Sequence, residues 1–155
     1  MFSVLVSIYK KENPSFCQES LCSIFAQTQQ PFEVIVVKDG SLTKELDDLL
    51  EYFQAKYPNI RVVSLPTNQG LGNALNEGLK YCSNEIVARM DTDDIAKPDR
   101  FERQLDVFRN HPEIDVVGAW IDEFEGNPLN VISTRKLPEK HNEIRNYAKK
   151  RNPVN

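Results

Sequence analysis

Short runs of apolar, often β-branched residues alternate with longer segments of helical period along most of the chain. Apolar runs of about four to eight residues are typical of strands that are buried on both faces of a sheet. The expected strands are residues 3–9, 33–39, 60–65 and 85–91.

The segments between these runs carry the start and stop signals of helices. Asn13 can cap the first helix, and Pro14 suits its first turn. Ser41 or Thr43 can cap the second, which should end before Pro58. We expect helices over residues 14–27, 43–57, 68–82 and 98–110.

Two of these helices show a stripe of residues at helical spacing on one face, the pattern of an amphipathic helix. The stripes are Phe16, Ser20, Ile24 and Gln27 in the first helix, and Leu71, Leu75, Leu79 and Cys82 in the third.

Strands and helices that alternate in this way predict right-handed βαβ units and a mostly parallel sheet. The expected fold is therefore a three-layer, Rossmann-like α/β domain with helices on both faces of the sheet. Residues 115–134 break the alternation and predict a strand followed by a hairpin, with EGNP as its turn. A last helix is expected over residues 138–152, and the abrupt end at Asn155 suggests a fragment of a longer protein.

The composition suits one compact domain, since the chain has 155 residues of which 40% are hydrophobic and 27% charged. A net charge of −4 argues against a nucleic-acid-binding surface, which would need a basic stripe. No apolar segment approaches the roughly 18 residues of a membrane span. The three cysteines form no C-x-x-C motif, so we expect reduced thiols and a cytoplasmic protein.

Polar residues follow the ends of three expected strands. These strand ends carry Ser7 and Tyr9, then Asp39, then the cluster Asp91, Asp93 and Asp94. The carboxyl ends of parallel strands meet at one edge of a sheet, where ligands bind, so we expect the carboxylates to converge. An extended backbone would place Asp91 and Asp93 on one side, about 7 Å apart.

The chain lacks the glycine-rich backbone cradles that bind phosphate directly, because it has neither a dinucleotide motif nor a P-loop. A phosphate ligand would therefore need a cation that bridges it to carboxylates. Mg²⁺ and Mn²⁺ take hard oxygen ligands of this kind. The alternative is a solvated acidic turn, in which Asp94 lies near a helix N-terminus.

Other candidates also have two interpretations. Asp39 belongs to DGS, a common turn in which Gly40 takes a positive φ, or its carboxylate accepts an N–H from a base such as uracil. Asn68 and Asn76 either contact ligand or are exposed at a helix start. Arg89 either pairs with a neighbouring acid or contacts a substrate phosphate.

Four further side chains have expected positions. Met90 and Phe101 should lie in the core, and Arg100 should lie on a solvated helix face with Lys97 and Arg103, or else contact ligand. Trp120 should lie in the hairpin core or stack on a sugar ring.

Four stretches in order resemble the nucleotide-binding half of inverting, family 2 glycosyltransferases of the GT-A fold. They are SVLVSIYKKE, LCSIFAQTQQPFEVIVVKDGS, NQGLGNALNEGL and EIVARMDTDDIAKPDRF, and the resemblance covers roughly residues 2–120. It implies a nucleotide-diphospho-sugar donor, expected to be a UDP-sugar, together with Mn²⁺ or Mg²⁺.

The resemblance also implies roles for individual residues. The nucleotide-sugar contacts would be Ser7, Tyr9, Asp39, Asn68, Asn76, Arg89 and Thr92, and the metal ligands would come from Asp91, Asp93 and Asp94. The chain departs from the family where Lys38 replaces an acid and where Leu75 replaces an arginine. The family's catalytic base, usually the Asp of a Glu-Asp pair, has no match after residue 120, so we expect the base and the acceptor-binding part beyond Asn155.

The expected function is transfer of the sugar, with inversion, to a saccharide or lipid-linked acceptor in cell-surface polysaccharide synthesis. No nucleic-acid partner is expected, and the full-length enzyme would associate peripherally with a membrane. Two alternatives stay open at this point: a Mg²⁺-dependent phosphohydrolase and a non-catalytic, nucleotide-binding α/β module.

Overall fold

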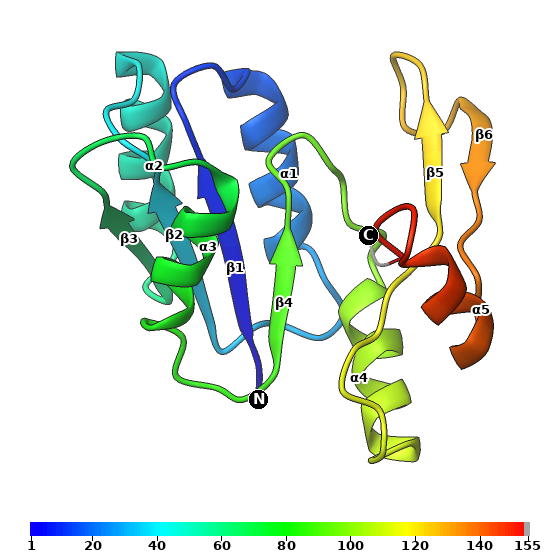
Figure 1. The fold of residues 1–155 in the computed structure, drawn as a ribbon. Helices are drawn as coiled ribbons and strands as arrows, with labels where there is room; N and C mark the ends of the chain where they lie inside the picture. Colours follow the sequence, from blue (N-terminus) through cyan, green and yellow to red (C-terminus); the bar gives the residue numbers. More distant parts are fainter. Residues whose placement is uncertain (154–155) are drawn as a thin grey trace. The chain divides into compact units, whose positions relative to one another are not determined.

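The computed structural model describes residues 1–153 and divides the chain into two compact units, residues 1–102 and residues 103–155 (Figure 1). None of the helices within residues 1–153 is long and apolar enough to cross a membrane.

The first unit is built on a four-stranded, all-parallel sheet in the order β3–β2–β1–β4. The strands are β1 (Ser3–Ile8), β2 (Glu33–Lys38), β3 (Ile60–Ser64) and β4 (Val87–Met90), as Figure 1 shows. The central strands β1 and β2 are almost entirely buried, which explains their continuous apolar runs. The parallel sheet predicted from the sequence is confirmed.

Helices cover both faces of this sheet (Figure 1). On one side lie α1 (Pro14–Phe25) and α2 (Lys44–Lys56), and on the other lies α3 (Leu71–Leu79). The cap of α1 is the predicted one, because Asn13 Oδ1 accepts the Ser15 N–H at 2.9 Å. Thr43, the second of the two predicted candidates, caps α2.

The predicted buried faces of α1 and α3 need correction. Phe16 is half exposed, and Cys17 and Leu21 are buried beside Ser20 and Ile24 instead. Phe16 sits on the first turn of α1, where the helix has just begun.

In α3 the buried residues are the small ones, Ala74 and Gly78, while Leu71 and Leu79 are half exposed. A Cβ atom on Gly78 would lie 2.5 Å from Leu5 Cδ1 and 2.6 Å from a methyl of Val37. The helix therefore approaches the sheet closely at Ala74 and Gly78, while Leu75 and Cys82 of the predicted stripe are partly buried against the same core.

The second unit contains a hairpin of β5 (Ile121–Phe124) and β6 (Val131–Arg135), followed by α5 (His141–Tyr147). The helix α4 (Arg100–Asn110) begins at the end of the first unit. The hairpin and its turn at residues 125–130 confirm the prediction, and α5 is shorter than expected.

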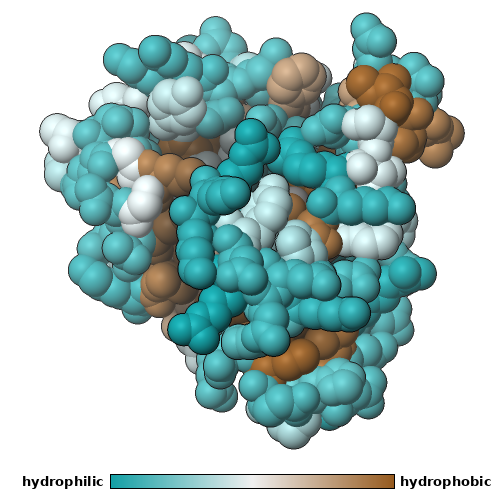
Figure 2. All heavy atoms as spheres, turned by 45° about the vertical axis from the view of Figure 1, so that its right-hand side comes forward, coloured by the Kyte–Doolittle hydropathy of each residue, from teal (hydrophilic) through white to brown (hydrophobic). Residues whose placement is uncertain are grey.

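The predicted strand before the hairpin was wrong. Residues 115–120 form no strand within the described part of the chain, because they enter no hydrogen-bonded ladder there. Trp120 is also half exposed instead of lying in a hairpin core, and its indole N–H donates to the Leu137 carbonyl at 3.2 Å. Leu129 and Ile132 are also exposed apolar side chains of this unit. The face drawn in Figure 2 is mostly hydrophilic, with separate hydrophobic patches.

Candidate functional site

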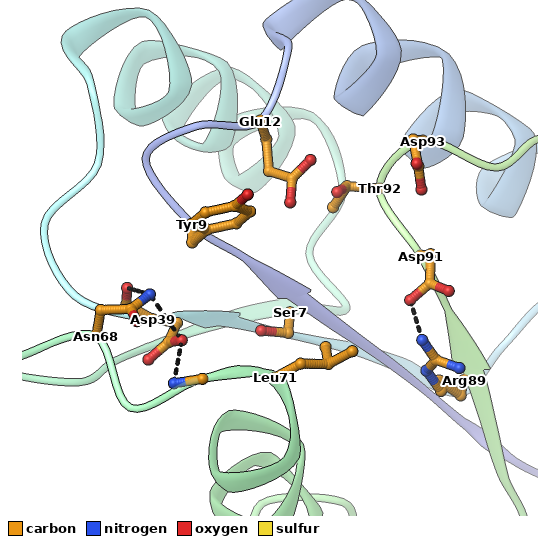
Figure 3. Close-up of a pocket in the computed structure, with 11 residues that line it drawn as sticks. Ser7, Tyr9, Glu12, Asp39, Asn68, Leu71, Arg89, Asp91, Thr92 and Asp93 are labelled. Atoms are coloured by element: carbon orange, nitrogen blue, oxygen red, sulfur yellow. Dashed lines mark hydrogen bonds and ion pairs between the residues drawn. The ribbon is translucent and has the colours of Figure 1, made fainter.

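A pocket of about 410 Å³ lies at the carboxyl edge of the parallel sheet (Figure 3). Its walls come from the ends of β1, β2 and β4 and from the loop before α3. The strand order reverses between β1 and β4, so the pocket lies at the switch point where open α/β sheets bind ligands. The predicted residues that line it are Ser7, Tyr9, Asp39, Asn68, Arg89, Asp91, Thr92 and Asp93.

Two predicted residues are not among those that line the pocket. Asn76 is exposed on α3, five residues after the pocket residue Leu71. Asp94 follows Asp93 in the loop after β4. Its pKa is raised by burial and by the negative charges of Asp93 and Asp91.

Asp39 organises one side of the pocket. Its carboxylate is 4% exposed and accepts three hydrogen bonds, from the Gln69 N–H at 2.6 Å, the Gly70 N–H at 2.9 Å and the Asn68 amide at 3.0 Å. A carboxylate has about four acceptor positions, so one remains for a ligand. The turn and the binding interpretations of Asp39 are therefore compatible.

Gly40 allows this arrangement. It has the predicted positive φ, 83°, and a Cβ atom there would lie 2.7 Å from the Asn68 backbone nitrogen. The loop before α3 thus packs directly on the backbone that follows β2, and Asp39 joins the two segments.

The opposite side of the pocket carries the acidic segment after β4 (Figure 3). Asp91 forms an ion pair with Arg89, and both side chains are about two-fifths exposed. The ion-pair interpretation of Arg89 is therefore present in the structure, beside its place in the pocket wall. Thr92 is buried, and Asp93 is exposed beyond it.

Arg100 is not on a solvated face, so that expectation was wrong. Its guanidinium donates to the Arg89 carbonyl at 3.0 Å and contacts Met90 Sδ at 2.9 Å. Burial lowers the pKa of this guanidinium. Met90 and Phe101 are buried in the core as predicted.

Glu12 is a pocket residue that the sequence analysis missed. It follows β1 in the YKKE loop and lies between Tyr9 and Thr92 (Figure 3). Burial raises the pKa of its carboxyl, the Thr92 hydroxyl lowers it, and the charges of Asp93 and Asp91 raise it again. Its only sequence signal was an acid shortly after a strand end, which also describes many solvated loops.

The donor set of this side suits a divalent cation. Glu12, Asp91 and Asp93 bring hard carboxylate oxygens to one wall, and their mutual repulsion would be relieved by positive charge. No three His, Cys, Asp or Glu side chains within residues 1–153 are already grouped as a metal site. A Mg²⁺-type site often uses only one or two carboxylates, with phosphate oxygens and water as the other ligands.

One protein family matches the chain over nearly its whole length. The family described as "Glycosyl transferase family 2" matches residues 3–154. A relative from Haemophilus influenzae named "Uncharacterized glycosyltransferase" is 46% identical over 99% of this chain and 57% of its own length. An Escherichia coli relative, named "UDP-Gal:alpha-D-GlcNAc-diphosphoundecaprenol beta-1,3-galactosyltransferase", is 41% identical over 99% of this chain and 55% of its own length.

Solved structures share the same architecture. The structure of Staphylococcus aureus TarS 1–349 in complex with UDP-GlcNAc superposes with a TM-score of 0.62 at 30% identity. That match covers 72% of this chain and 32% of the TarS chain. The chain spans a little over half the length of the H. influenzae and E. coli relatives.

Proposed function

Because the chain belongs to glycosyl transferase family 2, we propose that its first unit binds a nucleotide-diphospho-sugar, and specifically a UDP-sugar. The observation that carries the proposal is the pocket at the carboxyl edge of the sheet, with Asp39 on one side and Asp91 and Asp93 on the other. One side offers a hydrogen-bond acceptor for a base, and the other offers negative charge for a cation with diphosphate.

Two comparisons support a uridine nucleotide. TarS 1–349, at 30% identity, has been solved with UDP-GlcNAc and with UDP. The E. coli relative carries UDP-Gal in its name. The family match gives no support to the phosphohydrolase alternative.

The base and ribose would occupy the side of the pocket near β1 and β2. The remaining acceptor position of Asp39 suits the imide N–H of uracil, and Asn68 is held beside it. Ser7 and Tyr9 line the wall between the two sides, and Thr92 and Arg89 lie toward the expected diphosphate. Asn76, which is exposed on α3, would contribute only from outside the pocket wall.

We assign the metal ligands to the acidic side, as Mn²⁺ or Mg²⁺ held by Asp93 and Asp91, with Asp94 adjacent. When bound, the cation would stabilise negative charge on the departing diphosphate. Asp91 Oδ1 is engaged by Arg89, which leaves its other oxygen available, and Arg89 fixes the orientation of that carboxylate. Asp93 presents an exposed carboxylate.

The proposed reaction is a direct displacement with inversion. The acceptor oxygen bonds to the anomeric carbon as the bond from that carbon to the phosphate oxygen breaks, and UDP leaves. A general base takes the proton of the acceptor hydroxyl. We place this base and the acceptor-binding part in the share of the relatives' length that this chain does not cover.

The acceptor would be a saccharide or a lipid-linked saccharide in cell-surface polysaccharide synthesis. The E. coli relative is named for a diphosphoundecaprenol-linked acceptor, which supports the lipid-linked form and peripheral membrane association of the full-length enzyme. The three cysteines are free thiols, which supports a reducing, cytoplasmic compartment.

A thermal shift experiment on the 155-residue chain tests the proposal. At UDP concentrations about a hundredfold above the dissociation constant, binding should add about 2.7 kcal/mol of stability. For a chain of this size that corresponds to an increase in melting temperature of roughly 5–10 °C. The increase should require Mn²⁺ or Mg²⁺, and GDP should give a smaller one.

The variant Asp93→Asn should lose the metal-dependent increase. Asp48→Asn is the matched control, because it makes the same change on the exposed side of α2. A UDP-induced shift that is equal with and without metal would contradict the metal assignment, and no shift with any nucleotide would contradict the proposed function.

A further inference from the structure

Ser20 and Ser23 on α1 and Gln27 just after its end form a polar stripe, in which Ser20 and Gln27 are buried and Ser23 is partly buried. The spacing of these residues places them on the same face of the helix. Ser20 is 1% exposed and Gln27 is 4% exposed. Buried polar side chains are costly unless they form hydrogen bonds, so the partners of this stripe indicate its role. Those partners lie in the acidic segment after β4, at residues 91–97.

The beginning of the acidic segment is bound by Ser20. Its hydroxyl donates to the Asp91 carbonyl at 2.8 Å, at the point where β4 has just ended. This bond joins residues that are 71 positions apart in the sequence. It fixes the backbone of Asp91 while leaving the Asp91 carboxylate in the pocket wall.

The end of the segment is bound by the other two residues of the stripe. Ser23 Oγ accepts the Ala96 N–H at 3.0 Å. The Gln27 amide donates to the Lys97 carbonyl at 2.8 Å and lies 3.4 Å from the Ala96 carbonyl.

Gln27 uses the rest of its side chain in the same place. Its oxygen accepts the Phe101 N–H at 3.2 Å, and the N–H of the next residue, Thr28, donates to the Pro98 carbonyl at 2.8 Å. The side-chain amide of Gln27 therefore forms hydrogen bonds with backbone groups of the loop that have no partner in a helix or strand.

The residues between these two attachments have no regular backbone ladder, although the Thr92 hydroxyl interacts with the Glu12 carboxyl. They belong to no helix or strand, and the turn bond from the Asp94 N–H to the Asp91 carbonyl is long, at 3.4 Å. Asp91, Asp93 and Asp94 repel one another, which favours an expanded loop. Backbone attachments at both ends oppose that expansion without using any carboxylate oxygen.

We propose that Ser20, Ser23 and Gln27 are positioning residues that hold segment 91–97 in its binding conformation before any ligand arrives. The identity of the ligand, a nucleotide diphosphate with a divalent cation, rests on the proposed function. The positioning itself rests on the hydrogen bonds alone. The stripe acts through the backbone of the loop, and none of its three residues is among those that line the pocket.

The test uses the variants Ser20→Ala and Gln27→Ala in the full 155-residue chain. Gln18→Ala is the matched control, since Gln18 is exposed on the same helix. Ser20→Ala changes little volume, so it keeps the test valid where Gln27→Ala fails to fold. Ser20→Thr retains the hydroxyl and should behave more like the parent chain.

The first readout is amide hydrogen exchange without ligand. Loss of one hydrogen bond should speed exchange within residues 91–97 by up to about tenfold, while exchange in β2 stays unchanged. Equal acceleration in β2 and in the loop would show that the stripe only stabilises the fold, and unchanged exchange in the loop would likewise overturn the proposal.

The second readout is the ratio of the UDP dissociation constants measured without and with Mn²⁺. This ratio should fall by up to about tenfold in Ser20→Ala and stay unchanged in Gln18→Ala. If Ser20 had a purely structural role, Ser20→Ala would lower the melting temperature and leave the ratio unchanged. Faster exchange with an unchanged ratio would overturn the positioning role. If the parent chain binds no UDP, the proposed function fails, and the exchange measurement alone decides whether the stripe positions the loop.

Discussion

Replacement of Asp39 by asparagine tests how the pocket is held together. Two backbone N–H groups donate to different oxygens of this buried carboxylate: Gln69 N–H to Oδ1 and Gly70 N–H to Oδ2. An asparagine side chain has one oxygen and one NH₂ group. One of the two backbone N–H groups would therefore face a second donor and lose its partner.

The expected cost follows from that single lost bond. Hydrogen bonds to a charged group contribute about 1.5–3 kcal/mol, so the free energy of unfolding of Asp39→Asn should fall by about 2 kcal/mol. Urea denaturation monitored by circular dichroism measures this directly, and the melting temperature should fall by roughly 4–8 °C. The denaturant slope should stay unchanged because the folded state is retained.

Asp48→Asn serves again as the control. Asp48 pairs with Lys44 on the surface of α2, and exposed pairs of this kind contribute only about 0.5 kcal/mol. If Asp39→Asn proved as stable as Asp48→Asn, the loop before α3 would not depend on this carboxylate, and our account of the pocket wall would be refuted.

Two further predictions concern packing. Gly78→Ala should destabilise the chain by about 1–2 kcal/mol, because its methyl group would overlap Leu5. Gly72→Ala on the open side of α3 should be neutral or stabilising by up to about 1 kcal/mol. Equal effects of the two substitutions in chemical denaturation would contradict the close approach of α3 to the sheet. Cys17 is fully buried, and burial raises the pKa of its thiol to about 11. Iodoacetamide at neutral pH should therefore label the exposed Cys22 well before Cys17. Mass spectrometry would reveal the opposite order if the assigned face of α1 were wrong.

The strands and the position of the pocket were predictable from the sequence, for a physical reason. A strand buried on both faces must be apolar at every position, so the run VIVV in β2 could be little else. Parallel pairing then brings the strand ends to one edge. Asp39 and Asp91 were therefore placed together without knowledge of any side-chain contact.

The buried face of α3 could not be predicted in the same way. Hydrophobicity alone would place Leu71 and Leu79 on the buried face, but the short distance between the helix and the sheet places Ala74 and Gly78 there. That distance depends on the residues that face the helix from β1 and β2. The periodicity of the helix alone does not contain this information.

Polar residues were missed or misplaced for a related reason. Glu12 was not singled out, and Arg100 was expected on a solvated helix face, because sequence does not reveal what a charged side chain contacts. Ser20 and Gln27 were expected on the buried face of α1, but their hydrogen bonds to residues about 70 positions away could not be foreseen. The strand predicted before the hairpin failed because apolar residues form a strand only where a neighbouring strand offers a ladder.

The most direct test of the central claim is a crystal structure of the 155-residue chain with UDP and Mn²⁺. We predict the uracil beside Asp39 and Asn68, and the diphosphate and the ion beside Asp91 and Asp93. UDP bound away from the carboxyl edge of the sheet, or in the pocket with its diphosphate beside Asp39, would contradict the account.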